Sequence, residues 1–256
     1  MVVIQDVTEQ EAIENSRREF VANVSHELKT PLTTVKSYVE TMLENDVDTE
    51  TRSSFLKVID KEADRMARLV RDLLVLSRLD SKIIVQNREY INVSELIGEV
   101  IENQLMEIKK REHDITFHCV NELPLVYIDR DRLAQIITNI LSNAVKYTLP
   151  KGRIQVFASF IYGNVYIKIK DNGIGIPEKD LERIFERFYR VDKARSREQG
   201  GTGLGLAIAR EMIMAFGGDI LIDSKQDVGT EVCIVVPVDG KKEGGKEEDM
   251  AAFKKL

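Results

Sequence analysis

The chain has 256 residues, a length that suits two domains better than one. Its formal net charge is −6, from 37 basic and 43 acidic residues, which gives no basis for nucleic-acid binding. Charged residues make up 31% of the chain and aromatic residues 6%, a balance typical of long, charge-laced helices. There is no signal peptide and no run of about 18 apolar residues that could span a bilayer.

The first residues, 1–9, predict a short strand followed by a turn and the start of a helix. A single strand of this length is not stable alone, because its edges and faces have no partner. The segment resembles the last strand and exit of a PAS-type sensor module. We therefore expect the remnant of an upstream sensor module here, with an ordinary frayed N-terminus as the alternative.

Residues 10–81 predict two long helices joined by a short turn. In the first helix, apolar residues recur at spacings of 4, 3, 4 and 3, which is a heptad-like seam: Leu28, Leu32, Val35, Val39 and Met42. Asn45–Asp48 interrupts this pattern, and Asp48 suits the N-cap of a second helix that ends near Asp80. A two-helix hairpin buries only one stripe of each helix, so we expect two copies to pair as a four-helix bundle.

His26 points away from the apolar seam of the first helix. Helical positions advance about 100° each, which places His26 about 180° from Val35 and about 200° from Leu28. An exposed imidazole is available as a nucleophile, and the adjacent Glu27 can orient one ring nitrogen or take its proton. The alternatives are a satisfied core histidine and a solvated surface histidine.

Thr30 and Pro31, which follow His26 in the chain, support a functional role for this turn of the helix. Thr30 follows one helical turn later on the same side, so its hydroxyl can place a water molecule, or it can bond back within its own helix. Pro31 removes a helical hydrogen bond at a cost of about 3 kcal/mol and should kink the helix. A bend at this point makes sense as a hinge.

Residues 82–92 are expected to be a connector, and residues 93–238 mix helices with strands. We expect helices near 94–112, 130–147, 178–188 and 204–216, and strands near 114–120, 125–129, 154–162, 165–171, 219–224 and 230–237. Gly163-Asn164 marks a hairpin between two of these strands. The predicted fold is thus a helical-hairpin dimerisation domain followed by an α/β sandwich. Residues 239–256 predict a flexible tail, or else a short partner-binding helix.

Asn139, Asn143 and Lys146 follow at i, i+4 and i+7 on one face of the 130–147 helix. A neutral carboxamide can ligate Mg²⁺ without repelling phosphates, and a lysine can contact a phosphate directly. The alternative is a polar solvent face with an incidental pair of asparagines.

Two glycine motifs follow in the chain. Asp171 ends a strand and is followed by Gly173 and Gly175, which permit a tight turn and close approach of the backbone. A buried carboxylate there would accept from an exocyclic amine and select adenine, although a plain strand-end turn is the competing interpretation. The second motif leads into a helix whose N-terminus can hold phosphate oxygens: Gly201, Thr202, Gly203, Leu204 and Gly205. It is neither a Walker A loop nor a Rossmann fingerprint.

A basic stretch between the two glycine motifs is poor in apolar residues. It comprises Phe185–Arg190, which includes Tyr189, followed by Lys193, Arg195 and Arg197. Such a stretch is typical of a lid that closes over a triphosphate, and Arg190 is the candidate for the γ-phosphate. A solvated loop is the alternative for the three cations after Arg190.

The remaining reactive side chains suggest structural roles. Cys119 and Cys233 alternate with apolar residues in strand-like runs, so we expect two buried thiols in a reducing compartment. His113 and His118 have no cysteine or acid cluster at metal spacing.

The whole set of motifs, in this order, resembles the sensor histidine kinases of two-component signalling over roughly residues 8–238. The second domain resembles the ATPase fold that these kinases share with type II topoisomerases, mismatch-repair ATPases and heat-shock chaperones. The resemblance implies Mg-ATP as ligand, with Asn143 on Mg²⁺ and Asp171 on adenine. It also implies Lys146 and Arg190 on the phosphates, and Tyr147 beside the nucleoside.

The resemblance further implies ATP-dependent autophosphorylation of His26 in a homodimer formed through residues 10–81, then transfer to an aspartate of a response-regulator receiver domain. Glu27 and Thr30 match the Glu-x-x-Thr pattern of members that also dephosphorylate the regulator. The regulator is expected to dock around Thr33, Lys36 and Ser37. We expect a cytoplasmic portion, attached to a membrane only through absent upstream segments.

Two other classes of protein remain as alternatives. The first is a chaperone-like or conformational ATPase of the same fold, in which the histidine accepts no phosphate. The second is an interaction module with a degenerate pocket. A Ser/Thr kinase is disfavoured, because its glycine-rich loop, strand lysine and His-Arg-Asp set do not occur.

Overall fold

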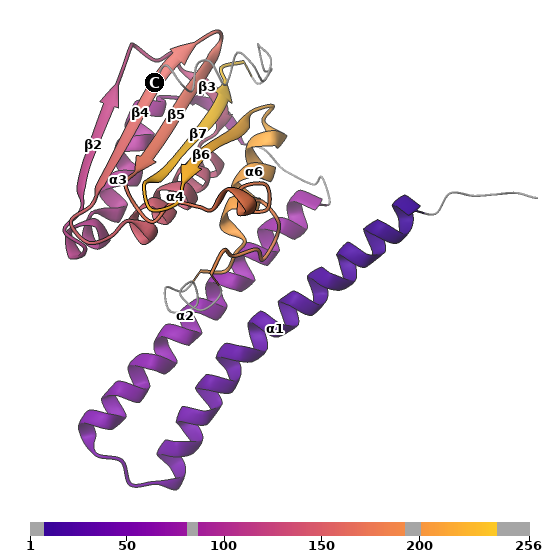
Figure 1. Ribbon diagram of the computed structural model, residues 1–256, viewed down its shortest axis with the longest axis vertical. Helices are drawn as coiled ribbons and strands as arrows, with labels where there is room; N and C mark the ends of the chain where they lie inside the picture. The colour runs from indigo at the N-terminus through magenta and orange to yellow at the C-terminus, as the bar shows by residue number, and fades with distance from the viewer. Residues whose placement is uncertain (1–7, 81–86, 193–200, 240–256) are drawn as a thin grey trace, which may run out of the picture. The chain divides into compact units, whose positions relative to one another are not determined.

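The computed structural model describes residues 8–80, 87–192 and 201–239 (Figure 1). The chain divides into two compact units. The first holds the described residues up to Leu74, together with Gly201 and Thr202, and the second holds the described residues from Val75 onward apart from these two. Most of the expected sensor remnant and of the tail lies outside the described residues.

The first unit is built on α1 (Thr8–Glu44) and α2 (Thr49–Asp80). The last turns of α2, from Val75 onward, belong to the second unit. Asp48 caps α2 as predicted, since its Oδ1 accepts from the backbone N–H groups of Glu50 and Thr51 at 2.9 Å each. Backbone and side-chain hydrogen bonds from Thr51 lower the pKa of Asp48. None of the helices in the described part of the chain has a stretch long and apolar enough to cross a bilayer.

The hairpin buries part of the predicted seam and leaves part of it exposed. Leu28, Val35 and Met42 of the seam are half-buried, and the rings of Tyr38 and Phe55 lie 4.7 Å apart between the two helices. Other large apolar side chains of the two helices remain exposed: Val21, Leu32, Val39, Leu43, Leu56, Val70 and Leu74. A single hairpin therefore leaves an apolar surface of the kind that a second helical hairpin covers.

The second unit is an α/β layer. Its strands are β1 (Arg88–Ile91), β2 (Asp114–Cys119), β3 (Val126–Asp129), β4 (Arg153–Ile161), β5 (Asn164–Asp171), β6 (Asp219–Lys225) and β7 (Gly229–Pro237). A five-stranded sheet has the order β2-β4-β5-β7-β6, in which only β2 and β4 are parallel. A separate antiparallel pair joins β1 to β3.

Three helices cover one face of this sheet (Figure 1): α3 (Val93–Lys110), α4 (Arg130–Tyr147) and α6 (Gly205–Ala215). α3 packs against β2, α4 against β5 and β7, and α6 against β6 and β7. α4 is amphipathic: Leu133, Ile137 and Leu141 recur every four residues and are at most 1% exposed. This periodicity fixes which side of α4 faces the core and leaves the opposite side for polar side chains.

The predicted fold class, a helical hairpin followed by an α/β sandwich, is confirmed, and most predicted elements lie within two residues of the observed ones. One strand was not predicted, and one predicted helix is wrong. β1 lies in the expected connector, because it exists only through pairing with β3, about 40 residues later. The expected helix at 178–188 is only a short 3₁₀ helix (Glu178–Asp180) followed by turns, and Phe188, with φ of +66°, ends any helical path.

Two local predictions also needed correction. The β4–β5 hairpin exists, but its loop is Tyr162-Gly163, with φ of +49° and +76°, because Asn164 already pairs with Ile161. Cys233 is buried as predicted, whereas Cys119 is exposed at the last residue of the edge strand β2. The alternation of residues indicates a strand, but it cannot show that the strand lies at an edge.

Candidate functional site

His26 is exposed on α1, as its helical angle predicts, and Ser25 and Lys29 beside it are exposed too. The ring is therefore open to other molecules from the side of α1 that does not face α2. An exposed imidazole on a rigid helix is suited to nucleophilic attack on an electrophile brought to it.

Glu27, by contrast, is turned toward α2. Its Oε2 lies 2.8 Å from Nη2 of Arg65, and the two side chains are only 15% and 8% exposed. Glu62, one turn before Arg65, approaches the other terminal nitrogen at 3.6 Å. Two carboxylates thus compensate one buried guanidinium, and the ion pair holds the Glu27 side chain against α2, one residue after His26.

An open groove of about 710 Å³ runs along α1 from His26. It is lined by His26, Lys29, Thr30, Thr33, Thr34, Ser37 and Tyr38. Two of the three expected docking residues are among them, whereas Lys36 pairs with Glu40 at 3.4 Å. Thr30 also lines the groove, and its hydroxyl donates to the His26 carbonyl at 3.1 Å, which is the bond within its own helix that was the alternative to a functional role.

On α4, the polar side carries Asn139, Asn143 and Lys146, all half-buried. The Asn139 amide donates to the carbonyl of Gly205 at 3.1 Å, so it ties α4 to the first residue of α6. This contact orients the Asn139 carboxamide and holds α4 against the start of α6, where the second glycine motif ends. Lys146 lies over the ring of Tyr147, with Nζ 5.0 Å from the centroid.

Asp171 lies at the end of β5 and is mostly buried. Its Oδ1 accepts from the N–H of Gly173 at 2.8 Å, yet burial raises the pKa of the carboxyl to about 6. A side chain at Gly173 would place its Cβ 2.5 Å from the carbonyl oxygen of Tyr147. The loop after β5 therefore closes directly on the end of α4 and brings Asp171, Gly173 and Tyr147 together.

Gly175 fixes the other side of the same loop. Its φ is +63°, and a Cβ there would lie 2.0 Å from the carbonyl oxygen of Lys225. Only glycine combines this backbone conformation with this close approach. Both glycines of the motif are thus explained by backbone packing around Asp171.

The segment before the expected lid has a defined structure around Tyr189. The Tyr189 hydroxyl donates to the buried Asp180 at 2.6 Å, which raises the pKa of Tyr189, and the Arg183 guanidinium stacks 4.2 Å from its ring. Arg190 follows and is half-buried. The cations at 193, 195 and 197 lie outside the described residues.

The second glycine motif is divided between the two units. In the second unit, the Gly203 carbonyl accepts from the N–H of Phe188 at 2.9 Å, and Leu204 is fully buried at the start of α6. Gly203 has φ of +73°, which favours glycine. In the first unit, the Thr202 hydroxyl donates to Asp72 at 2.9 Å, and burial raises the pKa of Asp72.

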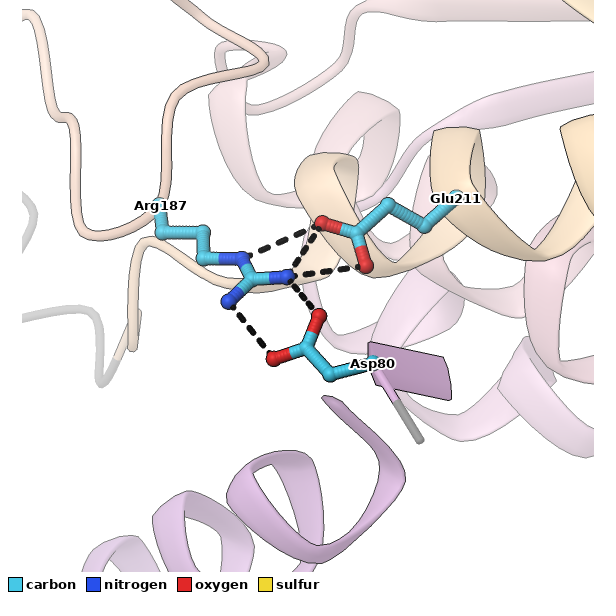
Figure 2. Close-up of polar contacts among 3 residues, drawn as sticks. All are labelled: Asp80, Arg187 and Glu211. Atoms are coloured by element: carbon cyan, nitrogen blue, oxygen red, sulfur yellow. Dashed lines mark hydrogen bonds and ion pairs between the residues drawn. The ribbon is translucent and has the colours of Figure 1, made fainter. Parts of the chain in front are cut away.

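A further charged cluster in the second unit was not found from the sequence (Figure 2). The Arg187 guanidinium contacts Asp80, in the last turn of α2, at 2.6 and 3.1 Å. It also contacts Glu211 of α6 at 2.9 and 3.1 Å. One arginine therefore joins the end of α2 to the helix that begins at the glycine motif.

Comparisons with known proteins agree with this two-part architecture. The phospho-acceptor domain model "His Kinase A" matches residues 16–82. The model for "Histidine kinase-, DNA gyrase B-, and HSP90-like ATPase" matches residues 128–240. The second unit is thus an ATP-binding domain of this type, preceded by a phospho-acceptor hairpin, and the chain belongs to the sensor histidine kinase family of two-component systems.

Two relatives are similar to this chain over nearly its whole length. "Sensor histidine kinase WalK" of Bacillus subtilis is 46% identical over 97% of this chain, which spans 41% of that protein. "Sensor protein kinase WalK" of Staphylococcus aureus is 43% identical over 97% of this chain and 60% of that protein. The chain therefore corresponds to about two fifths of the length of the first of these relatives.

Solved structures of histidine kinases are also similar to this chain. A catalytic domain of the histidine kinase ThkA is 31% identical, with a TM-score of 0.53 over 60% of this chain and 99% of that one. ThkA in complex with the response regulator protein TrrA is 28% identical, with a TM-score of 0.73 over 94% of this chain and 70% of that one.

Proposed function

We propose that this chain transfers the γ-phosphoryl group of ATP to His26 and then to an aspartate of a response-regulator receiver domain. The observation that carries the proposal is the exposed His26 imidazole at one end of the open groove along α1. The family supplies ATP as the phosphoryl donor. The regulator-bound relative supports a receiver domain as the next acceptor.

The loop after β5 supports recognition of adenine. Above pH 6 the Asp171 carboxylate is mostly ionised and can accept a hydrogen bond from the exocyclic amine of adenine, a donor that guanine lacks at this position. Tyr147, against which the loop closes, is placed beside the nucleoside in this proposal.

Phosphate contacts come from α4, the segment after Tyr189 and the start of α6. Lys146 and Arg190 meet the triphosphate as cations, and the backbone N–H groups of Gly203, Leu204 and Gly205 meet it at a helix N-terminus. Asn139 holds α4 against Gly205, so it acts on the position of these amides.

The donor set of α4 also suits Mg²⁺. The Asn143 carboxamide is a neutral oxygen ligand on a fixed helix, and it adds no negative charge beside the triphosphate. The ion, when bound, neutralises charge that develops on the transferred phosphoryl group. The remaining oxygens around such an ion would come from the nucleotide and water.

At the acceptor, one ring nitrogen of His26 attacks the γ-phosphorus in line. A phosphorus–nitrogen bond forms, the bond from phosphorus to the bridging oxygen breaks, and ADP leaves with that electron pair. Glu27 orients the ring and receives the proton from the other nitrogen, while Arg65 fixes the Glu27 carboxylate. The phosphoryl group then passes to a carboxylate oxygen of the regulator, and the nitrogen recovers its electron pair.

The groove along α1 gives the regulator a docking place next to the phosphoryl group. Thr30 lies on that groove one turn after His26, and its oxygen can hold the water that hydrolyses the regulator's aspartyl phosphate. A phosphatase activity toward the regulator is therefore part of the proposal.

A labelling experiment tests the central step. The protein is incubated with γ-labelled ATP and Mg²⁺ beside the His26→Gln and Asn143→Asp variants. We expect acid-labile, alkali-stable label that requires both residues, because phosphohistidine has this stability. ATP hydrolysis without label, or label that persists in His26→Gln, would support a conformational ATPase of the same fold instead.

A further inference from the structure

The last turn of α4 carries two side chains of the proposed nucleotide site, Lys146 and Tyr147. The residue four positions after Lys146, whose N–H would continue the helical pattern, is Pro150, and proline has no N–H. The Arg111 guanidinium takes its place, since Nη1 donates to the Lys146 carbonyl at 3.1 Å. The next carbonyl, of Tyr147, accepts from the N–H of Ile174 at 3.2 Å. Both carbonyl groups are therefore held from outside the helix.

Arg111 is anchored on α3 before it reaches α4. It is the C-cap residue of α3, and its backbone N–H donates to the carbonyl of Glu107 at 3.2 Å. Its Nε donates to the Glu107 carboxylate at 3.1 Å, a contact that lowers the pKa of Glu107. One planar guanidinium thus binds a carboxylate through Nε and the Lys146 carbonyl through Nη1, which fixes its orientation. A cation is also favoured at the C-terminal end of a helix such as α4.

Other hydrogen bonds join the turn after α3 to the turn after α4. The N–H of Lys151 donates to the Arg111 carbonyl at 3.0 Å. The ring of His113 lies with Nε2 3.1 Å from the Leu149 carbonyl, and because burial lowers the pKa of His113, the neutral ring donates through Nε2. These contacts do not depend on the Arg111 guanidinium. Its removal should therefore leave the two turns in contact and release mainly the Lys146 carbonyl.

The Lys146 carbonyl belongs to the backbone that sets the direction of the Lys146 side chain. The Lys146 ammonium lies 5.0 Å from the centre of the Tyr147 ring, so a shift of this last helical turn moves both side chains together. We propose that Arg111 is a positioning residue for ATP, which holds the backbone of Lys146 so that the ammonium meets the triphosphate. The inference rests on the proposed function, in which Lys146 contacts phosphate and Arg111 itself does not touch the nucleotide.

Arg111→Met tests this role, because it removes the guanidinium and keeps a long, unbranched side chain. We expect the affinity for ATP, measured by calorimetry, to fall about tenfold, the effect of losing one hydrogen bond from a charged donor. The KM for ATP in the labelling of His26 should rise by a similar factor. The single-turnover rate at saturating ATP should stay within about twofold, since the acceptor is unchanged. Arg111→Lys should recover part of the affinity.

Lys110→Met is the matched control. Lys110 precedes Arg111 and lies 3.6 Å from the same carboxylate, of Glu107, but its side chain is 76% exposed. The substitution removes the same charge beside the same partner, and ATP affinity should not change. Amide exchange without nucleotide gives a second readout: the N–H groups of Thr148 and Ile174 donate to carbonyl groups of α4. Both should exchange faster in Arg111→Met and not in Lys110→Met.

A double variant separates positioning from a general effect on the fold. Lys146→Met removes the side chain through which Arg111 acts. In that background Arg111→Met should weaken ATP binding by less than about twofold, because the group that it positions is already absent. Circular dichroism and the unfolding temperature show that each variant is folded under the conditions of the binding measurement.

Several outcomes would overturn the inference. Unchanged ATP affinity in Arg111→Met would show that the contact does not position the site. An equal loss of affinity with and without the Lys146 side chain would show that Arg111 acts on the fold. A wild type that binds ATP without labelling His26 would contradict the proposed phosphoryl transfer alone, since the affinities of the variants still decide the role of Arg111. A wild type that binds no ATP would overturn both.

Discussion

At the scale of single residues, the ion pair between Glu27 and Arg65 fixes the side chain that the proposed mechanism uses as a base. The carboxylate is half-buried against α2, so its partner decides where it points. If Arg65 acts through Glu27, Arg65→Met should lower the rate of His26 phosphorylation by roughly 10²-fold, the lower end of general-base contributions, and Arg65→Lys should recover part of the rate. The KM for ATP should not change. Single-turnover labelling at saturating and limiting ATP measures both quantities.

A double-variant comparison separates this role from a structural one. In a Glu27→Gln background, Arg65→Met should have no further effect on the phosphorylation rate, because the group it positions is already absent. Removal of one partner from a buried pair also destabilises the fold by about 3–5 kcal/mol. Rates are therefore compared below the unfolding temperature of each variant. An equal loss of rate in both backgrounds would show that Arg65 acts through the fold alone.

Asp171 gives a pH prediction. Burial raises its pKa to about 6, and the ionised form accepts a hydrogen bond from adenine more strongly than the protonated form does. ATP affinity should therefore fall as pH drops from 7.5 to 5. The nucleotide phosphates also titrate in this range, so calorimetry compares the protein with Asp171→Asn. The variant should bind weakly and show the smaller pH dependence; an identical pH dependence in both would contradict the assignment.

Residues were predictable when their role depends on local sequence. Asp171 and the glycines around it form one continuous motif, so the order of residues alone identifies them. The pairs of Arg65 with Glu27 and of Arg187 with Asp80 could not be identified in this way, because the partners lie 38 and 107 residues apart and nothing in the sequence pairs them. The same limit applies to Cys119, whose exposure depends on β2 being at the edge of the sheet.

At the scale of elements, the contact between the loop after β5 and the end of α4 makes Gly173 indispensable. A Cβ there would lie 2.5 Å from a backbone oxygen of Tyr147, which no rotamer change relieves. Gly173→Ala should displace the loop that carries Asp171 and weaken ATP binding by at least about tenfold, the effect of losing roughly 1.4 kcal/mol. Fluorescence titration with a labelled ATP analogue measures it.

Gly98 is the matched control for Gly173. It lies inside α3, and a Cβ there would meet nothing within 4 Å. Gly98→Ala should leave ATP binding unchanged and raise the free energy of unfolding by about 0.5–1 kcal/mol, since alanine loses less backbone entropy in a helix. Weakened nucleotide binding in Gly98→Ala would show that the assay reports stability, and unchanged binding in Gly173→Ala would contradict the packing explanation.

Arg187 connects elements within the second unit (Figure 2). Arg187→Met removes its contacts with Asp80 and Glu211, so amide exchange at residues 75–80 should become faster while exchange in α4 stays unchanged. Arg183→Met is the control, because Arg183 forms an exposed ion pair with Glu186, three residues along the chain. Equal exchange at 75–80 in Arg187→Met and the wild type would show that the bridge does not hold the end of α2.

At the scale of the whole molecule, the order of the elements was predictable because hydrophobic periodicity changes along the chain. The heptad-like spacing of α1 and the alternation in β4 and β5 identify helices and strands without tertiary information. The β1–β3 pair was not predictable, since it depends on two segments that meet only after folding.

The pairing of two hairpins is the remaining prediction at this scale. Leu32 and Val39 lie seven residues apart on α1 and are 57% and 37% exposed in a single chain. Burial of each such side chain contributes about 1.5–3 kcal/mol, so Leu32→Glu with Val39→Glu in both copies should weaken a dimer roughly a thousandfold or more. Sedimentation equilibrium should then change from dimer to monomer. Leu149→Glu, at a residue 54% exposed in the second unit, should leave the dimer intact. ATP binding should survive in both, because the ATP-binding domain is a compact unit with its own core. A dimer that persists in the double variant would place the interface on another part of the chain.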